Sequence, residues 1–455
     1  MKSEKMYGVF TFQEKDYPFI LEKQILTIPQ VPLQYKDDFE GINHIEEIHG
    51  VTNSNRNVVF LGCEVLNAGS FFSFMEVKLS ILGYIILQND KTTFDKIEFY
   101  SEGINGFYSP RNAYQIEDDG QMRGTGIKLR DAETYRRNYE CKILGEEINI
   151  GLNIFTSLNL AFERNVMGTA ESLLSVSFGE KKQPHDILKY SLYIMDFLEF
   201  INFQKNIPLE KITLYWKNND GKYQPCGKAV VFQAENDQYS PSAMRSITFP
   251  DITEECFPIL FSQIAERRES KRFNPFFYPE NRRADRVIDA SKWLNNAICF
   301  EGAFDDAFPE YKAQHDTAFC EVKTYLLNTI DSAVEKTNKS INNRQNSAWK
   351  RFRKMIQNAD TTIQEKFEAC QVEFEEETKV AIQRIRNKYD IQETVNLAES
   401  YSSFRNNTAH GTIKKPGNEE IATYQILRCF VYAMNLKRAG VPSKNISAII
   451  MKLFQ

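Results

Sequence analysis

The sequence is poor in histidine and tryptophan and has no long apolar run. Five histidines and three tryptophans occur in 455 residues, so imidazole chemistry has few candidate positions. The most apolar stretch, residues 71–87, is interrupted by Glu76 and Lys78, and no run of about 18 apolar residues exists that could form a transmembrane helix. The first residues alternate charges with aromatics and lack the apolar region of a signal peptide. We therefore expect a cytoplasmic chain that makes no contact with a membrane.

Closely spaced cysteine pairs are also lacking. The eight cysteines are scattered along the chain, and no Cys-x-x-Cys pair occurs. Scattered cysteines in a long chain are typical of reduced, mostly buried thiols, which argues against a disulfide-stabilised scaffold and against a zinc ribbon. No motif calls for a cofactor or a resident metal. His44 and His49 are interpreted as surface turn residues, with a metal-binding pair as the alternative.

The chain is long enough for two or three folded units, and its charge is unevenly distributed. With 56 basic and 61 acidic residues the net charge is −5. Residues 271–455 hold 28 basic and 23 acidic residues, so residues 1–270 hold the other 28 and 38, giving balances of +5 and −10. A polyanion is therefore expected to meet the back of the chain rather than the front.

The front of the chain, residues 1–270, has the pattern of a β-rich domain. Short aromatic and β-branched segments alternate with turn residues, as in residues 7–12, 57–61, 71–79, 84–87 and 96–100. Further segments of this kind are residues 141–144, 149–155, 173–178, 212–216 and 229–232. One helix is predicted from about residue 187 to 204. This front domain could contain two subdomains, with a break near residues 156–184.

The back of the chain, residues 282–455, has the pattern of a helical bundle. Apolar residues recur at helical spacing from Val322 to Val334 and from Ile363 to Phe374, and the pattern continues from Ile391 to Phe404. A last long helix is expected with Asn418 as N-cap, Lys437 and Arg438 in its final turn, and a stop at Gly440. The predicted fold class is therefore α+β, with a β-rich N-terminal domain and an all-α C-terminal domain.

The most suggestive site lies where one of these helices ends. Arg405, Asn406 and His410 occur in the segment Arg-Asn-Asn-Thr-Ala-His, directly before Gly411. Asn406 and His410, four positions apart, share a helix face, and a helix end at His410 would let the imidazole turn towards Arg405. A guanidinium binds phosphate oxygens and an imidazole transfers protons near neutral pH, so the group suits a phosphodiester. Chance alone gives roughly 0.7 Arg-x4–6-His matches in such a chain, so an ordinary polar helix end is the alternative.

The position of this motif resembles the HEPN superfamily, whose ribonucleases carry an Arg-(polar)-x4–6-His motif near the end of a helical domain. The front, including residues 48–63, 84–87 and 94–99, resembles the N-terminal domain of ApeA-like HEPN proteins, which are bacterial anti-phage factors. The resemblance implies metal-independent cleavage of cellular RNA, transfer RNA among the candidates, during abortive infection. It also implies a homodimer, or a higher oligomer, in which each HEPN domain contributes Arg405 and His410 to one site.

The expected chemistry follows from the substrate. RNA supplies the 2′-OH as its own nucleophile, so the protein needs only a base, an acid and stabilisation of the developing charge. One His410 would take the proton of the 2′-OH and the second would protonate the leaving oxygen. Arg405 would bind the phosphorane, and Asn406 would orient a histidine or contact a phosphate oxygen. A phage-encoded trigger or inhibitor is a further expected partner.

A second basic segment could contact RNA. The residues that we predict to bind RNA are Arg344, Trp349, Lys350, Arg351, Arg353, Lys354, Lys414 and Lys415. The alternative for the helix that contains Trp349 is that Phe352 and Met355 face the core while the cations are solvated. The alternative for the whole chain is a non-catalytic HEPN scaffold that dimerises and binds a nucleotide or nucleic acid.

Overall fold

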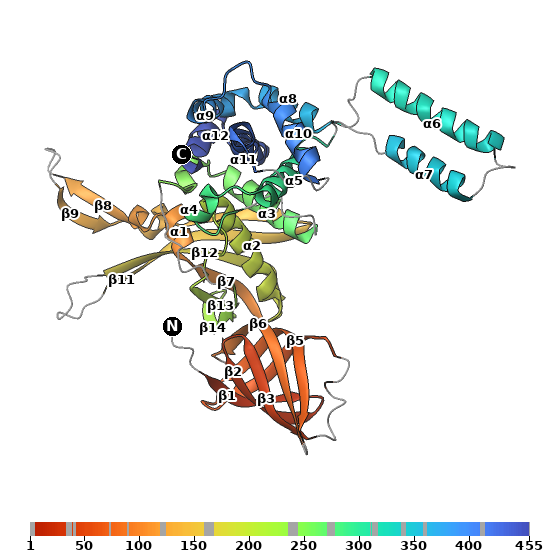
Figure 1. The fold of residues 1–455 in the computed structure, drawn as a ribbon. Coiled ribbons are helices and arrows are strands. Elements are labelled where there is room, and N and C mark those ends of the chain that lie inside the picture. The colour runs from red at the N-terminus through yellow and green to blue at the C-terminus, as the bar shows by residue number, and fades with distance from the viewer. Residues whose placement is uncertain are drawn as a thin grey trace. The chain divides into compact units, whose positions relative to one another are not determined.

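The computed structural model divides into two compact units. It describes residues 5–32, 39, 42–71, 74–88, 91–118, 124–158, 168–234, 244–270, 278–309, 311, 317–337, 343–357, 362–409 and 415–454. Unit 1 comprises Met1–Arg272 and Tyr278–Arg286, and the rest of the chain, chiefly Val287–Gln455, forms unit 2. Figure 1 shows strands throughout the first and helices alone in the second. The α+β class, β-rich in front and helical behind, is confirmed.

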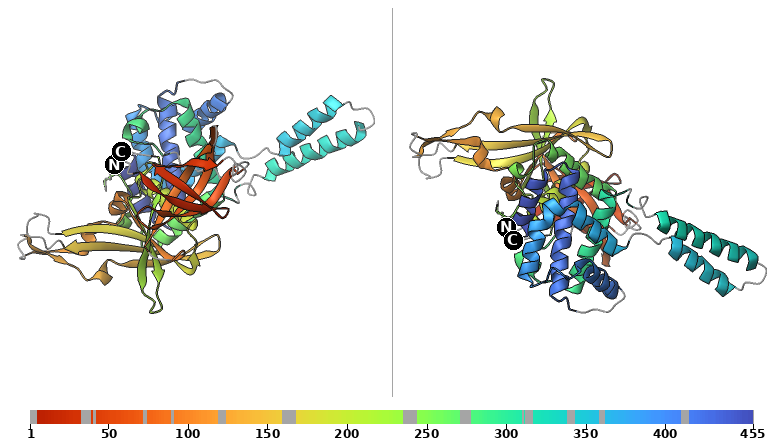
Figure 2. Two further views of the ribbon diagram at one scale, coloured as in Figure 1. Left: turned by 90° about the horizontal axis from the view of Figure 1, so that it is seen from below. Right: turned by 90° about the horizontal axis from the view of Figure 1, so that it is seen from above.

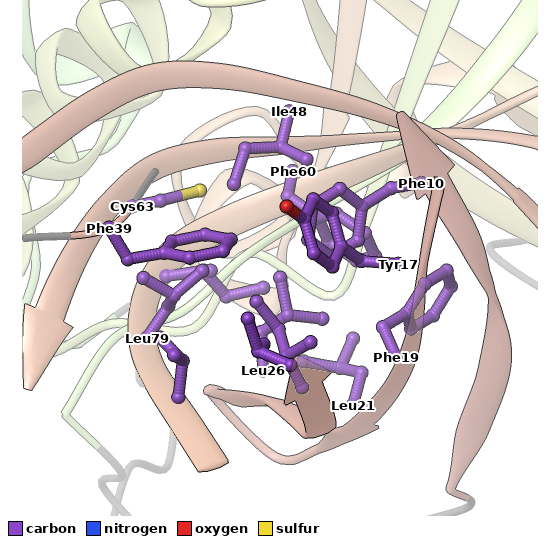
Figure 3. Close-up of a cluster of buried hydrophobic side chains, with 14 of the residues drawn as sticks. Phe10, Tyr17, Phe19, Leu21, Leu26, Phe39, Ile48, Phe60, Cys63 and Leu79 are labelled. Carbon is purple, nitrogen blue, oxygen red and sulfur yellow. The ribbon is translucent and has the colours of Figure 1, made fainter. Parts of the chain in front are cut away.

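Six strands of unit 1 close into a barrel. They pair in the order β6-β3-β2-β1-β4-β5, and the two end strands, β5 and β6, pair with each other to complete the ring. Their bounds are β1 Met6–Phe12, β2 Lys15–Glu22, β3 Ile25–Pro32, β4 His44–Thr52, β5 Asn57–Phe71 and β6 Phe74–Leu87. Alternate residues of β6 are buried, as the two-residue period of a strand requires. These side chains meet inward-facing aromatics such as Phe10, Tyr17 and Phe60 in one packed core (Figure 3).

Strand β6 belongs both to the barrel and to an open sheet. Along one edge it pairs with β5 over its whole length. Along the other edge residues 74–80 pair with β3, and residues 83–87 pair with β14. From β14 the sheet continues through β13, β7, β12 and β11 to β10. The bounds are β7 Phe94–Tyr100, β10 Arg137–Ile143, β11 Glu146–Leu158, β12 Gly168–Lys182, β13 Lys211–Lys217 and β14 Tyr223–Val231.

Helices cover the open sheet of unit 1. α2 (Asp186–Asn202) and α3 (Cys256–Glu269) pack against each other, and α3 also packs on β10. Phe197 of α2 contacts Phe257 of α3, and Phe178 of β12 contacts Tyr190 of α2 at a ring distance of 4.6 Å. The remaining elements are the hairpin β8 Tyr114–Asp118 with β9 Gly124–Leu129, the helices α1 Glu102–Phe107 and α4 Arg282–Arg286, and 3-10 turns at Pro110–Ala113, Ala132–Thr134 and Phe249–Asp251.

Unit 2 is built around α11 (Asn418–Arg438), in which every residue from Ala422 to Leu436 except Gln425 is buried. An apolar surface on all sides requires neighbours on all sides, and α5, α9, α10 and α12 supply them. The other helices are α5 Ala290–Ala307, α6 Thr317–Thr337, α7 Asn343–Gln357, α8 Ile363–Glu373, α9 Glu375–Lys388, α10 Leu397–Ala409 and α12 Ser443–Leu453. α6 packs against α7, and Figures 1 and 2 show the two side by side.

Four local expectations were wrong. Residues 84–87 are not a separate strand, because Gly83 continues β6 by pairing with Leu61 and with Val231. His44 and His49 lie on strand β4, which pairs with β5, and not in a turn. Ile391 and Val395 precede α10, whose first turn is capped by the side chain of Asn396. The N-cap of α11 is Gly417 rather than Asn418, whereas the predicted end at Lys437 and Arg438 is confirmed.

Candidate active site

Helix α10 carries two of the three predicted catalytic residues, Arg405 and Asn406. The helix begins where the side chain of Asn396 accepts hydrogen bonds from the backbone N–H groups of Ala398 and Glu399. Tyr401 and Phe404 fix its inner face, because their rings pack on Trp293 of α5. These aromatic contacts hold α10 against α5, so the part of α10 that carries Arg405 is held at a defined position beside α5.

Arg405 forms a bidentate ion pair with Glu301 of α5. Its Nε donates to Oε1 at 3.2 Å and its Nη2 donates to Oε2 at 3.3 Å. The arginine side chain is 28% exposed and the glutamate side chain 23% exposed, so the pair lies at the surface without being freely solvated. A guanidinium has five N–H donors, so this pair leaves Arg405 with donors for an anion. Glu301 lies 104 positions from Arg405 and belongs to no local motif, so the sequence alone does not predict this contact.

Tyr401 lies one turn before Arg405 on α10 and is fully buried. Its ring contacts Phe300 and Phe367 besides Trp293. Burial raises the pKa of Tyr401 well above its ordinary value, and the charge of Glu301 adds to this effect. The residue therefore stays a neutral phenol at physiological pH and serves to position the helix.

Asn406 and Asn407 are exposed at the same helix end. Asn407 lines a cleft of about 440 Å³ together with Phe404, Glu399, Glu419 and Glu420. Glu420 is partly engaged, because its carboxylate accepts the backbone N–H of Gly417 at 2.9 Å. The cleft is acidic, so it repels a phosphodiester, and an anion is expected to reach α10 from the side of Arg405.

His410 and Lys414 lie outside the described residues, so their predicted roles stay predictions. α10 is described up to Ala409, the residue before His410. Lys415 is exposed and lies three residues before the start of α11. The structure therefore brings Arg405 and Asn406 together and adds Glu301 to them.

The other predicted RNA-binding residues lie on α7, and Arg344 belongs to the same helix. Lys350, Arg351 and Lys354 are exposed, and Trp349 is half-buried. Arg353 pairs with Asp331 of α6 through two hydrogen bonds, of 2.7 and 3.2 Å. Phe352 and Met355 are 56% and 68% exposed, so the alternative that they face the core is wrong. α7 packs on α6.

The described residues contain no group of three metal-ligating side chains placed to hold a metal ion. His44 and His49 are five positions apart on a strand, which directs their side chains to opposite faces. His49 and His185 instead share the carboxylate of Glu47, at 3.0 and 2.6 Å. Seven of the eight cysteines are buried as free thiols, and Cys320 is exposed. Burial raises the pKa of the Cys63 thiol to about 12, which makes it a poor nucleophile.

One comparison with known proteins decides the family. Residues 19–266, more than half of the chain, match the family model described as ApeA N-terminal domain 1. The chain belongs to the ApeA N-terminal domain 1 family. This ApeA match begins within β2 and ends within α3, so it includes both barrel and open-sheet strands. Membership in the ApeA family points to anti-phage defence, and it confirms the N-terminal half of the predicted resemblance.

No curated protein and no solved structure matches the chain. The HEPN assignment of unit 2 therefore stays a prediction. Among the described residues, no helix is long and apolar enough to cross a membrane.

Proposed function

We propose that this ApeA-family chain is a metal-independent endoribonuclease of the HEPN type, which cleaves cellular RNA during anti-phage defence. The observation that carries the proposal is the Arg405–Glu301 pair on α10, with Asn406 exposed next to Arg405. His410 is four residues further along the sequence than Asn406. A surface guanidinium that is oriented by a carboxylate and still has free donors is suited to hold a phosphate in a fixed position. Its helix precedes the central helix α11, where the HEPN resemblance expects it.

The proposed reaction uses two copies of the chain. His410 of one copy takes the proton of the 2′-OH, and His410 of the other protonates the 5′ oxygen that leaves. The 2′ oxygen bonds to phosphorus as the P–O5′ bond breaks, so the products are a 2′,3′-cyclic phosphate and a 5′-hydroxyl end. Arg405 stabilises the charge of the phosphorane, and Asn406 orients an imidazole or a phosphate oxygen. Unit 1, with its excess of acidic residues, regulates the site or recognises a phage component rather than holding RNA.

The test is cleavage of cellular RNA by the purified full-length protein with EDTA present. Arg405→Ala and His410→Ala are expected to lose activity, whereas Arg438→Ala, which removes an exposed arginine at the end of α11, is expected to retain it. Fragments that are labelled by a 5′-kinase without prior phosphatase treatment identify 5′-hydroxyl ends. Unchanged cleavage by Arg405→Ala or by His410→Ala contradicts the proposal.

One observation favours a second function. The cleft beside Asn407 contains three carboxylates, which is unfavourable for a site that handles phosphodiesters. A non-catalytic scaffold, in which unit 2 dimerises and binds a nucleotide or nucleic acid, tolerates such a cleft. The two functions differ in cells: overproduction of a ribonuclease is toxic and His410→Ala removes the toxicity, whereas a scaffold shows no such difference.

A further inference from the structure

Helices α6 and α7 form a two-helix hairpin with an unusual distribution of charge. The two helices pack against each other (Figure 2). The ion pair between Arg353 and Asp331 joins them. α7 contains five cationic residues and no acidic residue within Asn343–Gln357. Of these, Lys350, Arg351 and Lys354 are exposed and form no ion pair with a described residue. The α6–α7 hairpin thus carries a concentrated positive charge that its own acidic residues do not neutralise.

Aromatic and apolar side chains are exposed on the same hairpin. Tyr325 of α6 is 70% exposed, and Phe352 of α7 is 56% exposed. On α7, Arg351 and Met355 are four positions apart and lie on one side of Phe352. The exposed ring is therefore bordered by an unpaired guanidinium, while Lys350 and Lys354 lie together on the opposite face.

We propose that the α6–α7 hairpin is a binding site for single-stranded RNA that is separate from the α10 site, a proposal that rests on the ribonuclease function. Lys350, Arg351 and Lys354 pair with phosphates, and Phe352 and Tyr325 stack on bases. Arg353, which the sequence placed among the RNA-binding residues, instead ties the two helices together through Asp331. Tyr325 and Phe352 take its place in the binding surface.

The charge pattern favours RNA over a protein partner. The centre of a protein–protein interface is depleted of charged residues, because burying an unpaired cation is costly. Here the unpaired guanidinium of Arg351 stands next to the exposed ring of Phe352, so a protein that covered the ring would have to bury that cation as well. A nucleic-acid strand instead offers phosphates and bases in alternation, which matches this mixture.

Binding is measured in the full-length His410→Ala protein, which cannot cleave its ligand, by fluorescence anisotropy with a labelled single-stranded oligoribonucleotide of mixed sequence. The triple variant Lys350→Glu/Arg351→Glu/Lys354→Glu is expected to bind RNA far more weakly. The salt slope of binding, which is the slope of log K against the logarithm of the salt concentration, is expected to fall in magnitude by roughly 2. Tyr325→Ala/Phe352→Ala is expected to weaken binding roughly 10-fold while the salt slope stays the same. In the active protein the same changes raise KM and leave kcat unchanged, because the hairpin recruits the substrate and does no chemistry.

A matched control changes three exposed lysines elsewhere in unit 2, Lys379→Glu/Lys388→Glu/Lys444→Glu, and is expected to bind like the parent. Equal losses in the control and the hairpin variants overturn the proposal, since net charge alone would then explain the result. It is equally overturned if the hairpin variants bind RNA normally but light scattering shows that they change from dimer to monomer. If the hairpin variants bind and cleave normally while Arg405→Ala does not cleave, the hairpin site fails and the ribonuclease function stands.

Discussion

Arg405 and Glu301 face each other from α10 and α5 with two nearly equal hydrogen bonds, 3.2 and 3.3 Å long. The glutamate fixes the plane of the guanidinium, and therefore the direction in which its remaining N–H groups point. In the proposed ribonuclease this makes Glu301 a positioning residue for Arg405.

Replacing Glu301 therefore affects cleavage without contact between Glu301 and the RNA. Glu301→Ala is expected to lower kcat roughly 10- to 100-fold, because a small displacement of the guanidinium removes it from the transition state. Glu301→Gln is expected to recover part of this loss, since the amide still accepts one hydrogen bond. Glu376→Ala, which removes an exposed glutamate of α9, is the control, and equal rates for Glu301→Ala and the parent contradict the role.

Trp293 is the central anchor of the α5–α10 contact. Its indole is fully buried, contacts Tyr401 and Phe404, and donates to the carbonyl of Glu420 at 2.8 Å. Trp293→Ala is expected to reduce the free energy of unfolding of unit 2 by about 3–5 kcal/mol, because it leaves a cavity and removes the hydrogen bond to the Glu420 carbonyl. Chemical denaturation that monitors the helical signal tests this. Trp293→Phe, which keeps most of the packing, is expected to be less harmful.

The stability of unit 1 is expected to fall as the pH rises towards neutrality because of Glu199. Burial raises the pKa of Glu199 to about 7, although its bond from the backbone N–H of Asn206 acts in the opposite direction. Since the folded pKa exceeds the ordinary value of 4.5, the folded state holds this proton more tightly. The stabilisation is complete below pH 4.5 and is lost as the pH rises through about 7. Glu199→Gln is expected to raise the Tm at pH 8 and to flatten this dependence, whereas the exposed control Glu180→Gln should do neither.

Glu146 is expected to show the opposite pH dependence. Burial raises the pKa of its carboxyl, but the hydrogen bonds from Lys182, Tyr190 and Lys189 outweigh burial and lower it to about 2. The stabilisation is therefore present above pH 4.5 and is lost as the pH falls through about 2. Glu146→Gln is expected to lower the Tm at pH 7 and to converge with the parent in strong acid. If the Tm of Glu146→Gln differed from that of the parent by the same amount at all pH values, packing rather than charge would be responsible for the difference.

The sequence predicts those elements whose signals are local. The periodic apolar residues of α2, α6 and α8 and most strands of the open sheet are visible in it. Strands β2 and β3 are not predicted by the sequence pattern, because Pro18, Pro29 and Pro32 interrupt it. In the barrel, Pro32 lies at the end of β3 and Pro29 lies in the irregularity between Ile28 and Val31, while Pro18 pairs with Val9 of β1 and precedes the residues of β2 that pair with β3. Closure of the barrel also requires β1 to pair with β4 and β3 to pair with β6, and no local pattern encodes these pairings because the strands are not neighbours in the sequence.

The candidate site shows the same division. Arg405 and Asn406 belong to a motif that can be read in one segment, so the sequence predicts that both lie on this helix. Glu301 comes from another helix, and its contact with Arg405 is created only when α5 and α10 pack around Trp293. The exposure of Phe352 could not be read from its helical stripe either, because a stripe shows that a face is apolar and not whether a neighbouring helix covers it.

The dual membership of β6 has a consequence for dissecting the protein. A fragment cut after residue 88 would keep all six barrel strands but would leave the backbone groups of residues 83–87 open along the edge that β14 occupies. An unpaired strand edge can pair with the strands of other molecules, so the excised barrel is expected to aggregate rather than to stay monomeric. Capping that edge by grafting the β13–β14 hairpin onto the fragment is the natural remedy.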